Sequence, residues 1–192
     1  MNQTVPEPPT AGRRSPSAVA LVGFMGAGKT TVGRELAARV GWRFLDADEL
    51  IEIRERRTIE QIFREDGEPA FRRLECAVVR DAIKTPESTP IVLALGGGAF
   101  IEPGIQKCLQ EARVPTVFLD AHVDELFRRC EQPGVERPLR RNAEQFCKLY
   151  EQRRREYLKA AIRVDTSTKA VAEIVKEIIL GLDLVPASGA WD

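Results

Sequence analysis

The sequence is poor in the side chains that bind metals or form disulfides. Among its 192 residues there is one histidine, His122, and only four cysteines, Cys76, Cys108, Cys130 and Cys147, none of them in a CxxC pair. The usual zinc sites need several cysteine or histidine ligands at short, defined spacings. No zinc site is therefore expected, and scattered cysteines in a chain of this length indicate a reduced, cytoplasmic protein.

An excess of charge of one sign and long apolar runs are also missing. Lys plus Arg number 29 and Asp plus Glu number 29, so the formal net charge is zero. This balance excludes a globally basic nucleic-acid binder and an acidic solvating chain. No stretch is apolar for the roughly 18 residues that a membrane-spanning helix needs. We therefore expect neither nucleic acid nor a membrane as a partner.

The hydrophobic content, 43%, is sufficient for the core of one domain, and both ends of the sequence are typical of tails. Residues 1–17 hold four prolines among polar and small residues, which predicts a disordered N-terminal tail. Residues 183–192 are expected to form a flexible C-terminal tail. The domain itself is expected to span 18–182.

Within this domain, short apolar runs alternate with longer amphipathic ones. The expected strands are Ala18–Val22, Arg43–Asp46, Ile91–Leu95, Thr116–Leu119 and Ile162–Val164. The expected helices are Lys29–Val40, Glu49–Arg56, Ile59–Glu65, Pro69–Lys84, Pro103–Glu111, Val123–Cys130, Ala143–Ala160 and Lys169–Leu180. This alternation predicts an α/β fold, a three-layer sandwich whose five-stranded parallel sheet is covered on both faces. Ligands of such sheets bind beyond the carboxyl ends of the strands.

Several residues mark where these helices begin and end. Thr58 and Gln61 have the spacing of a capping box, and Pro69 suits the first turn of a helix. Gly41 and Gly67 stand where helices are expected to end.

The strongest motif is a glycine-rich loop between the first strand and the first helix. Residues 23–30 read Gly-Phe-Met-Gly-Ala-Gly-Lys-Thr and fit GxxxxGK[ST]. Backbone N–H groups of such a loop surround phosphate oxygens, and the helix N-terminus adds partial positive charge. Lys29 would reach the β- and γ-phosphates of ATP, and the Thr30 hydroxyl would ligate Mg²⁺. The flanking strand and helix favour this interpretation over a glycine-rich turn with an incidental lysine.

Two carboxylates follow the second strand, in Leu45-Asp46-Ala47-Asp48. Residues two apart in an extended chain point to the same face, so both could face a site beyond the strand end. One would hold a Mg²⁺-bound water and the other would receive a hydroxyl proton. An aspartate that caps the following helix is the alternative, and the pair alone does not decide between them.

Two further patterns are compatible with a ligand site but do not prove one. Arg72 and Glu75 lie three residues apart on one helix face, where a surface ion pair explains them equally well. Gly96, Gly97 and Gly98 follow an apolar strand and suit a close approach of the backbone to a ligand. The alternative for the glycines is a flexible turn.

In combination and order, these motifs resemble those of the shikimate kinases. The resemblance runs from Ala18 to Leu182. It rests on the phosphate loop with Gly33-Arg34, Leu45-Asp-Ala-Asp48, Gly67-Glu-Pro-Ala-Phe-Arg-Arg-Leu-Glu75, Leu95-Gly-Gly-Gly-Ala99, Arg137-Pro-Leu139 and Arg153-Arg-Arg-Glu-Tyr157. It implies a P-loop kinase fold of the nucleoside monophosphate kinase type, with a mobile lid at about 132–142.

The resemblance also implies a role for each matching residue. Catalysis would involve Lys29, Asp48 and Arg137, with Asp48 as the proposed base. The nucleotide would bind to Gly26, Ala27, Gly28, Lys29, Thr30, Thr31, Arg129 and Arg137. Shikimate would bind to Asp48, Arg72, Gly96, Gly97, Gly98 and Arg153, with Glu75 orienting the two arginines. Thr30 and Asp46 would hold Mg²⁺.

The segment from Arg137 to Lys159 holds eight basic and three acidic residues. Counted alone, it could be an RNA- or phosphate-binding patch, but it lacks the interleaved aromatics that stack on bases. A lid that closes over ATP also needs positive charge, and we favour that interpretation. Arg140 follows Arg137-Pro-Leu139 where the family usually has an apolar residue.

The implied function is ATP-dependent phosphorylation of the 3-hydroxyl of shikimate, in chorismate and aromatic amino-acid biosynthesis. The partners would be ATP, Mg²⁺ and shikimate. The protein itself would be a cytoplasmic monomer. A gluconate-type kinase is an alternative, because its acid substrate would also need an arginine clamp. The other alternative is a non-catalytic ligand-sensing module with the same fold.

Overall fold

The fold is taken from a computed structural model, which describes residues 16–84, 89–131 and 143–187. The expected lid, with Arg137 and Arg140, lies outside the described residues, as does most of the expected N-terminal tail. Part of the expected C-terminal tail is packed rather than loose. Leu184 is buried, and the backbone N–H of Ala187 donates to the carbonyl of Arg39 at 2.8 Å.

Five parallel strands form the central sheet. They are β1 (Ala18–Val22), β2 (Arg43–Asp46), β3 (Ile91–Ala94), β4 (Thr116–Asp120) and β5 (Ile162–Asp165), in the spatial order β2-β3-β1-β4-β5. Every residue of β1, β3 and β4 is buried, as expected for strands covered on both faces. The strand that leads into the glycine-rich loop is therefore the middle one.

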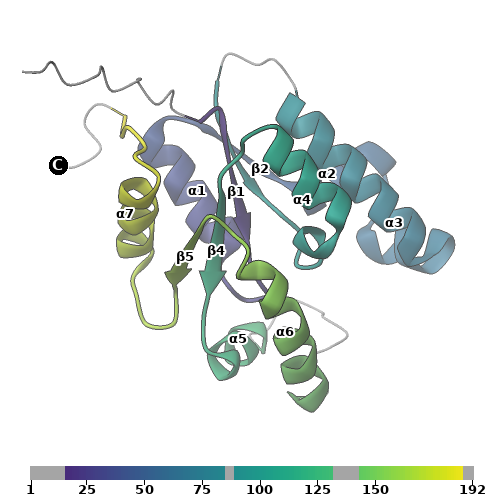
Figure 1. The fold of residues 1–192 in the computed structure, drawn as a ribbon. Helices are drawn as coiled ribbons and strands as arrows, with labels where there is room; N and C mark the ends of the chain where they lie inside the picture. The colour runs from purple at the N-terminus through teal and green to yellow at the C-terminus, as the bar shows by residue number, and fades with distance from the viewer. Residues whose placement is uncertain (1–15, 85–88, 132–142, 188–192) are drawn as a thin grey trace, which may run out of the picture.

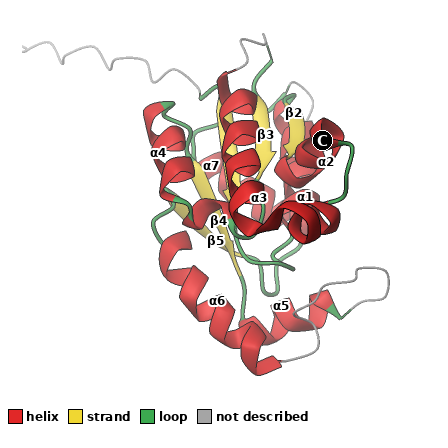
Figure 2. Ribbon diagram, turned by 90° about the vertical axis from the view of Figure 1, so that its right-hand side faces the viewer, coloured by secondary structure: helices red, strands yellow, loops and turns green. Residues whose placement is uncertain are grey.

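The helices are α1 (Lys29–Val40), α2 (Ala47–Glu55), α3 (Ile59–Lys84), α4 (Pro103–Glu111), α5 (Val123–Cys130), α6 (Ala143–Tyr157) and α7 (Val171–Gly181), with a short 3₁₀ turn η1 (Ala99–Ile101). In Figure 1, α1 and α7 lie together on one side of the sheet, and α3 and α4 lie on the other. Figure 2 shows α5 and α6 together at one end of the molecule. The expected three-layer architecture is confirmed.

The expected elements are present, with ends shifted by up to three residues. The largest shift is at α6, which ends at Tyr157 rather than Ala160. The two helices expected around Gly67 are one element, α3, with a kink at Gly67 (φ 77°, ψ 169°). The capping box is confirmed, because the N–H of Thr58 donates to Gln61 at 2.8 Å and the N–H of Gln61 donates to the Thr58 hydroxyl at 3.2 Å.

One large hydrophobic core surrounds the sheet, and a smaller cluster joins α2 to α3. The smaller cluster consists of Ile51, Ile62, Phe71 and Val78. Packing between these two helices is therefore partly independent of the sheet. Within the described ranges, none of the helices combines the length and the hydrophobicity that crossing a membrane requires.

Candidate active site

A cavity of about 880 Å³ lies at the carboxyl ends of β1, β2 and β3, where the fold is expected to bind its ligands. Most of the residues predicted for the site line this cavity: Gly26, Gly28, Lys29, Thr30, Thr31, Asp46, Asp48, Arg72, Glu75, Gly96, Gly97, Gly98, Arg129 and Arg153. Ala27 is buried and does not line it. Arg137 lies outside the described residues.

The glycine-rich loop forms one end of the cavity. Gly26 and Gly28 have φ angles of 81° and 89°, a conformation that side chains disfavour. A Cβ on Gly26 would also lie 2.8 Å from the carbonyl oxygen of Leu126. Lys29 reaches back over the loop, and its Nζ donates to the carbonyls of Gly23 at 2.8 Å and Phe24 at 3.1 Å. The loop and the α1 N-terminus thus form a cradle suited to phosphate.

The capping interpretation is confirmed for Asp46, whereas its role toward Mg²⁺ stays a prediction. Its Oδ1 accepts the N–H of Asp48 at 3.1 Å and caps α2, while its Oδ2 accepts the Thr30 hydroxyl at 3.0 Å. The expectation that Asp48 lies in an extended chain was wrong, because β2 ends at Asp46 and Asp48 belongs to the first turn of α2. The helix, rather than an extended chain, carries the Asp48 carboxylate to the cavity.

The three glycines after β3 form a floor, and each lies against a different part of the site. A Cβ on Gly96 would lie 2.7 Å from both Asp48 Oδ1 and Glu75 Oε1, and one on Gly98 would lie 2.7 Å from Arg72 Nη2. A Cβ on Gly97 would lie 3.7 Å from Arg153 Nη1. Gly96 and Gly98 therefore make room for charged side chains of the site, whereas a Cβ at Gly97 would make an ordinary contact.

Arg72 and Glu75 are not a surface pair. The Glu75 side chain is 1% exposed and that of Arg72 is 17% exposed, and Arg72 Nη1 donates to Glu75 Oε2 at 2.7 Å. Arg72 Nη2 also donates to Glu68 Oε1 at 3.0 Å. The neighbouring Arg73 is exposed, as expected of a solvated helix face. Glu75 thus holds the Arg72 guanidinium against the glycine floor.

Burial raises the pKa of Glu75 from 4.5 to about 7, with a further increase from the nearby charge of Asp48. Arg72 opposes this increase but does not cancel it. Glu75 Oε1 is also buried without a hydrogen-bond partner within the described structure. A carboxyl group in this setting titrates close to neutral pH, as groups at functional sites often do.

Arg153 enters the cavity from α6, whereas Arg72 comes from α3. Its Nη1 donates to the carbonyl of Gly97 at 3.2 Å, and its guanidinium lies 5.8 Å from the Phe24 ring centroid. The Tyr157 hydroxyl donates to the same carbonyl. Two arginines from different helices therefore meet at the glycine floor, an arrangement that suits the planar, two-oxygen charge of a carboxylate.

Arg129 lies beside the glycine-rich loop. It donates to the carbonyls of Thr166 at 2.6 Å and Ser167 at 3.2 Å and pairs with Glu125 at 2.8 Å. A longer contact of 3.4 Å joins it to the carbonyl of Gly26 in the phosphate loop. Arg129 thus ties the loop before α7 to the phosphate loop.

Sequence reasoning missed an apolar wall of the cavity. Ile59, Phe63 and Phe71 line it from the two halves of α3, and the rings of Phe63 and Phe71 lie 4.5 Å apart between centroids. Ile59 and Phe63 are four residues apart, so their shared helix face was a usable signal. Glu52 also lines the cavity, and its carboxylate accepts the N–H of Ile59 at 3.0 Å.

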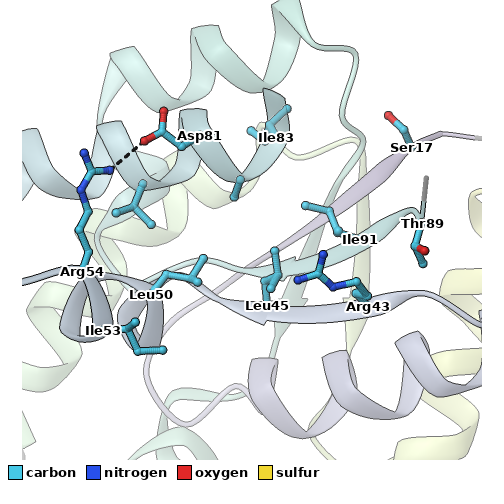
Figure 3. Close-up of a pocket in the computed structure, with 12 residues that line it drawn as sticks. Ser17, Arg43, Leu45, Leu50, Ile53, Arg54, Asp81, Ile83, Thr89 and Ile91 are labelled. Atoms are coloured by element: carbon cyan, nitrogen blue, oxygen red, sulfur yellow. Dashed lines mark hydrogen bonds and ion pairs between the residues drawn. The ribbon is translucent and has the colours of Figure 1, made fainter. Parts of the chain in front are cut away.

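A second cavity, of about 380 Å³, opens on the other side of α2 (Figure 3). Its walls come from β2, α2 and α3, and Arg54 pairs with Asp81 at 2.8 Å across it. It contains none of the residues predicted for the site. The larger cavity is therefore the candidate active site.

Comparisons with known proteins agree with this geometry. The family model "Shikimate kinase" matches residues 25–183. A shikimate kinase of Thermus thermophilus is 42% identical over 164 residues, which cover 84% of this chain and 87% of that protein.

Two solved structures share the fold over most of their length. One is shikimate kinase from Bacteroides thetaiotaomicron, with a TM-score of 0.79 and 29% identity. The match covers 98% of that chain and 87% of this one. The other is shikimate kinase from Acinetobacter baumannii in complex with shikimate, with a TM-score of 0.75 and 31% identity. The match covers 95% of that chain and 88% of this one. The chain belongs to the shikimate kinase family.

Proposed function

We propose that the chain transfers the γ-phosphoryl group of ATP to the 3-hydroxyl of shikimate and releases shikimate 3-phosphate and ADP. The observation that carries this proposal is one cavity with a phosphate loop at one end and a pair of arginines at the other. Asp48 lines the same cavity, beside Gly96 of the glycine floor. The reaction belongs to chorismate and aromatic amino-acid biosynthesis, and we propose that it takes place in the cytoplasm.

At the nucleotide end, the phosphate loop binds the phosphates of ATP, and Lys29 stabilises the charge that develops on the transferring group. Thr31 extends the cradle along the first turn of α1. Arg129 borders the space that the base would occupy. Arg137 stays a prediction, with the proposed role of a lid residue that reaches the transferring phosphate.

The donor set of Thr30 and Asp46 fits Mg²⁺. A hydroxyl and a carboxylate oxygen 3.0 Å apart are hard ligands of the kind Mg²⁺ prefers. Among the described residues, no group of three or more His, Cys, Asp or Glu could hold a metal. Mg²⁺ usually binds through one or two protein groups together with substrate phosphates. Bound there, it would neutralise charge on the β- and γ-phosphate oxygens.

At the acid end, Arg72 and Arg153 bind the carboxylate of shikimate, and Gly96, Gly97 and Gly98 let the ring approach the backbone. Asp48 accepts the hydrogen of the 3-hydroxyl and orients its oxygen toward the phosphorus. Most of the catalysis comes from this positioning, because phosphoryl transfer requires little covalent chemistry of the protein.

The deciding experiment is coupled ADP production with Mg-ATP and shikimate, gluconate or no acceptor. We expect turnover with shikimate alone. Turnover with gluconate instead would assign the chain to another acid kinase, and ligand binding without turnover would indicate a sensing module. Asp48→Asn should then lower kcat by about a hundredfold or more, since it removes the proton acceptor. We further propose a monomer that acts without nucleic acid or a membrane, which sedimentation of the active protein would check.

A further inference from the structure

A buried aspartate at the end of β4 connects the sheet to the helix that carries Arg153. The Asp120 side chain is 4% exposed. It accepts hydrogen bonds from the Tyr150 hydroxyl at 2.8 Å and from Arg154 Nη2 at 2.9 Å, both on α6. It also pairs with Arg163 Nε of β5 at 2.9 Å. A buried carboxylate with charged and hydroxyl donors makes strong, directional hydrogen bonds.

The two α6 donors also contact each other. Arg154 Nε donates to the Tyr150 hydroxyl at 3.1 Å, so Asp120, Tyr150 and Arg154 close a triangle. Burial and the bond to Asp120 raise the pKa of Tyr150 to about 12, which keeps its hydroxyl protonated and able to donate. This triangle fixes both the position of α6 and its rotation about its own axis.

Rotation of α6 matters because Arg153 and Arg154 are consecutive. Neighbouring residues of an α-helix project about 100° apart, so the contact that Arg154 makes determines where Arg153 points. Arg154 is directed to Asp120 and Arg153 to the carbonyl of Gly97 at 3.2 Å. In the sequence, Arg154 was only an additional charge in a basic segment; the structure gives it a buried partner.

We propose that Asp120 and Arg154 are positioning residues for the acid substrate, holding α6 so that Arg153 meets the carboxylate. This inference rests on the proposed carboxylate-binding role of Arg153. Neither residue lines the cavity, so neither contacts the substrate. Errors of about 1 Å in the placement of a substrate-binding group can cost about a hundredfold in rate.

The chain offers a matched control. Arg163 pairs with the same Asp120 oxygen, Oδ2, at the same 2.9 Å, but it lies on β5 and its side chain is 54% exposed. Arg154→Gln and Arg163→Gln each remove one guanidinium from this carboxylate. Only Arg154→Gln removes a contact between α6 and Asp120. In both variants Asp120 keeps two of its three side-chain donors, which favours folding.

The experiment measures KM for shikimate, KM for ATP and kcat for both variants, together with their melting temperatures. We expect Arg154→Gln to raise KM for shikimate about tenfold and to change KM for ATP less than about twofold. Arg163→Gln should change both by less than about twofold. Equal effects of the two variants on KM for shikimate would overturn the proposal.

A second comparison uses the Arg153→Ala background. If Arg154 acts through Arg153, then Arg154→Gln should raise KM for shikimate no further once Arg153 is absent. An additional tenfold increase in that background would overturn the proposal. If Arg153→Ala alone left KM for shikimate unchanged, the proposed role of Arg153 itself would fail. Asp120→Asn, which keeps the size of the side chain, should reproduce the selective rise in KM for shikimate.

Discussion

At the scale of single residues, the glycine floor determines how closely the charged groups of the site can gather. At Gly96 the position of the missing Cβ is 2.7 Å from carboxylate oxygens of both Asp48 and Glu75. A carbon and an oxygen that are not bonded cannot stay this close, so one of them must move. A single methyl group there displaces two functional carboxylates together.

We expect Gly96→Ala to lower kcat/KM for shikimate by about a hundredfold, since it misplaces Asp48. The measurement is steady-state kinetics with a melting curve that shows the protein still folds. Gly104→Ala in α4 is the control, because the nearest atom to its new Cβ would be Cys76 Sγ at 3.8 Å. Comparable kinetics for the two variants would contradict the crowding argument.

The raised pKa of Glu75 predicts that the free energy of unfolding depends on pH. The unfolded chain holds the Glu75 proton with the ordinary pKa of 4.5, and the folded protein holds it with a pKa of about 7. The folded state therefore binds this proton more tightly. Its contribution to the free energy of unfolding is complete below pH 4.5 and is lost as the pH rises through about 7.

Glu75→Gln removes this titration. We expect the free energy of unfolding of the variant, relative to that of the parent protein, to be higher at about pH 8 than at about pH 5. Urea unfolding at both pH values measures the difference, and the exposed Glu111→Gln serves as the reference substitution. Identical pH profiles for parent and Glu75→Gln would mean that Glu75 does not titrate in this range.

At the scale of elements, the kink in α3 joins two parts of the cavity wall. The first half of the helix carries Ile59 and Phe63 of the apolar wall, and the second half carries Arg72 and Glu75. Gly67 joins the halves with φ 77° and ψ 169°, a region almost confined to glycine. The angle between the half of α3 that carries Ile59 and Phe63 and the half that carries Arg72 depends on this residue.

Gly67→Ala should destabilise the fold by about 1 to 3 kcal/mol and raise KM for shikimate, with little effect on KM for ATP. Chemical unfolding and steady-state kinetics test the two parts separately. A variant as stable as the parent would show that the helix accommodates a side chain at the kink.

Much of the fold could be predicted from the sequence because its signals are local. The bounds expected for α1, α4 and α5 are the observed ones, and Gly67 with Pro69 marked the interruption in α3. Burial could not be predicted in the same way. The burial of Glu75 and the pairing of Arg154 with Asp120 depend on helices that meet only in the folded molecule. The apolar wall was missed although the four-residue spacing of Ile59 and Phe63 places them on one helix face.

At the scale of the whole molecule, the cavity has two ends built from different elements. The nucleotide end depends on β1 and α1, and the acid end depends on α2, α3 and α6. The groups proposed to bind ATP are thus distinct from those proposed to bind shikimate. Each ligand should stabilise the protein through its own end.

We expect Lys29→Met to reduce stabilisation by Mg-ATP while stabilisation by shikimate persists, and Arg153→Ala to do the reverse. At a ligand concentration of about 100 times Kd, full stabilisation amounts to about 2.7 kcal/mol. Melting temperatures with each ligand alone measure both effects. Loss of both stabilisations in either variant would indicate that the two ends do not bind independently.

The glycine floor also limits how this enzyme can diversify. A side chain added at Gly96 or Gly98 would displace Asp48, Glu75 or Arg72 before it could contact a new acceptor. The apolar wall has more freedom, because Phe63 is 37% exposed at the cavity. Mutational routes to a new acceptor therefore begin at that wall. A library restricted to Ile59 and Phe63 should yield altered acceptor preference, whereas one restricted to Gly96 and Gly98 should yield inactive protein.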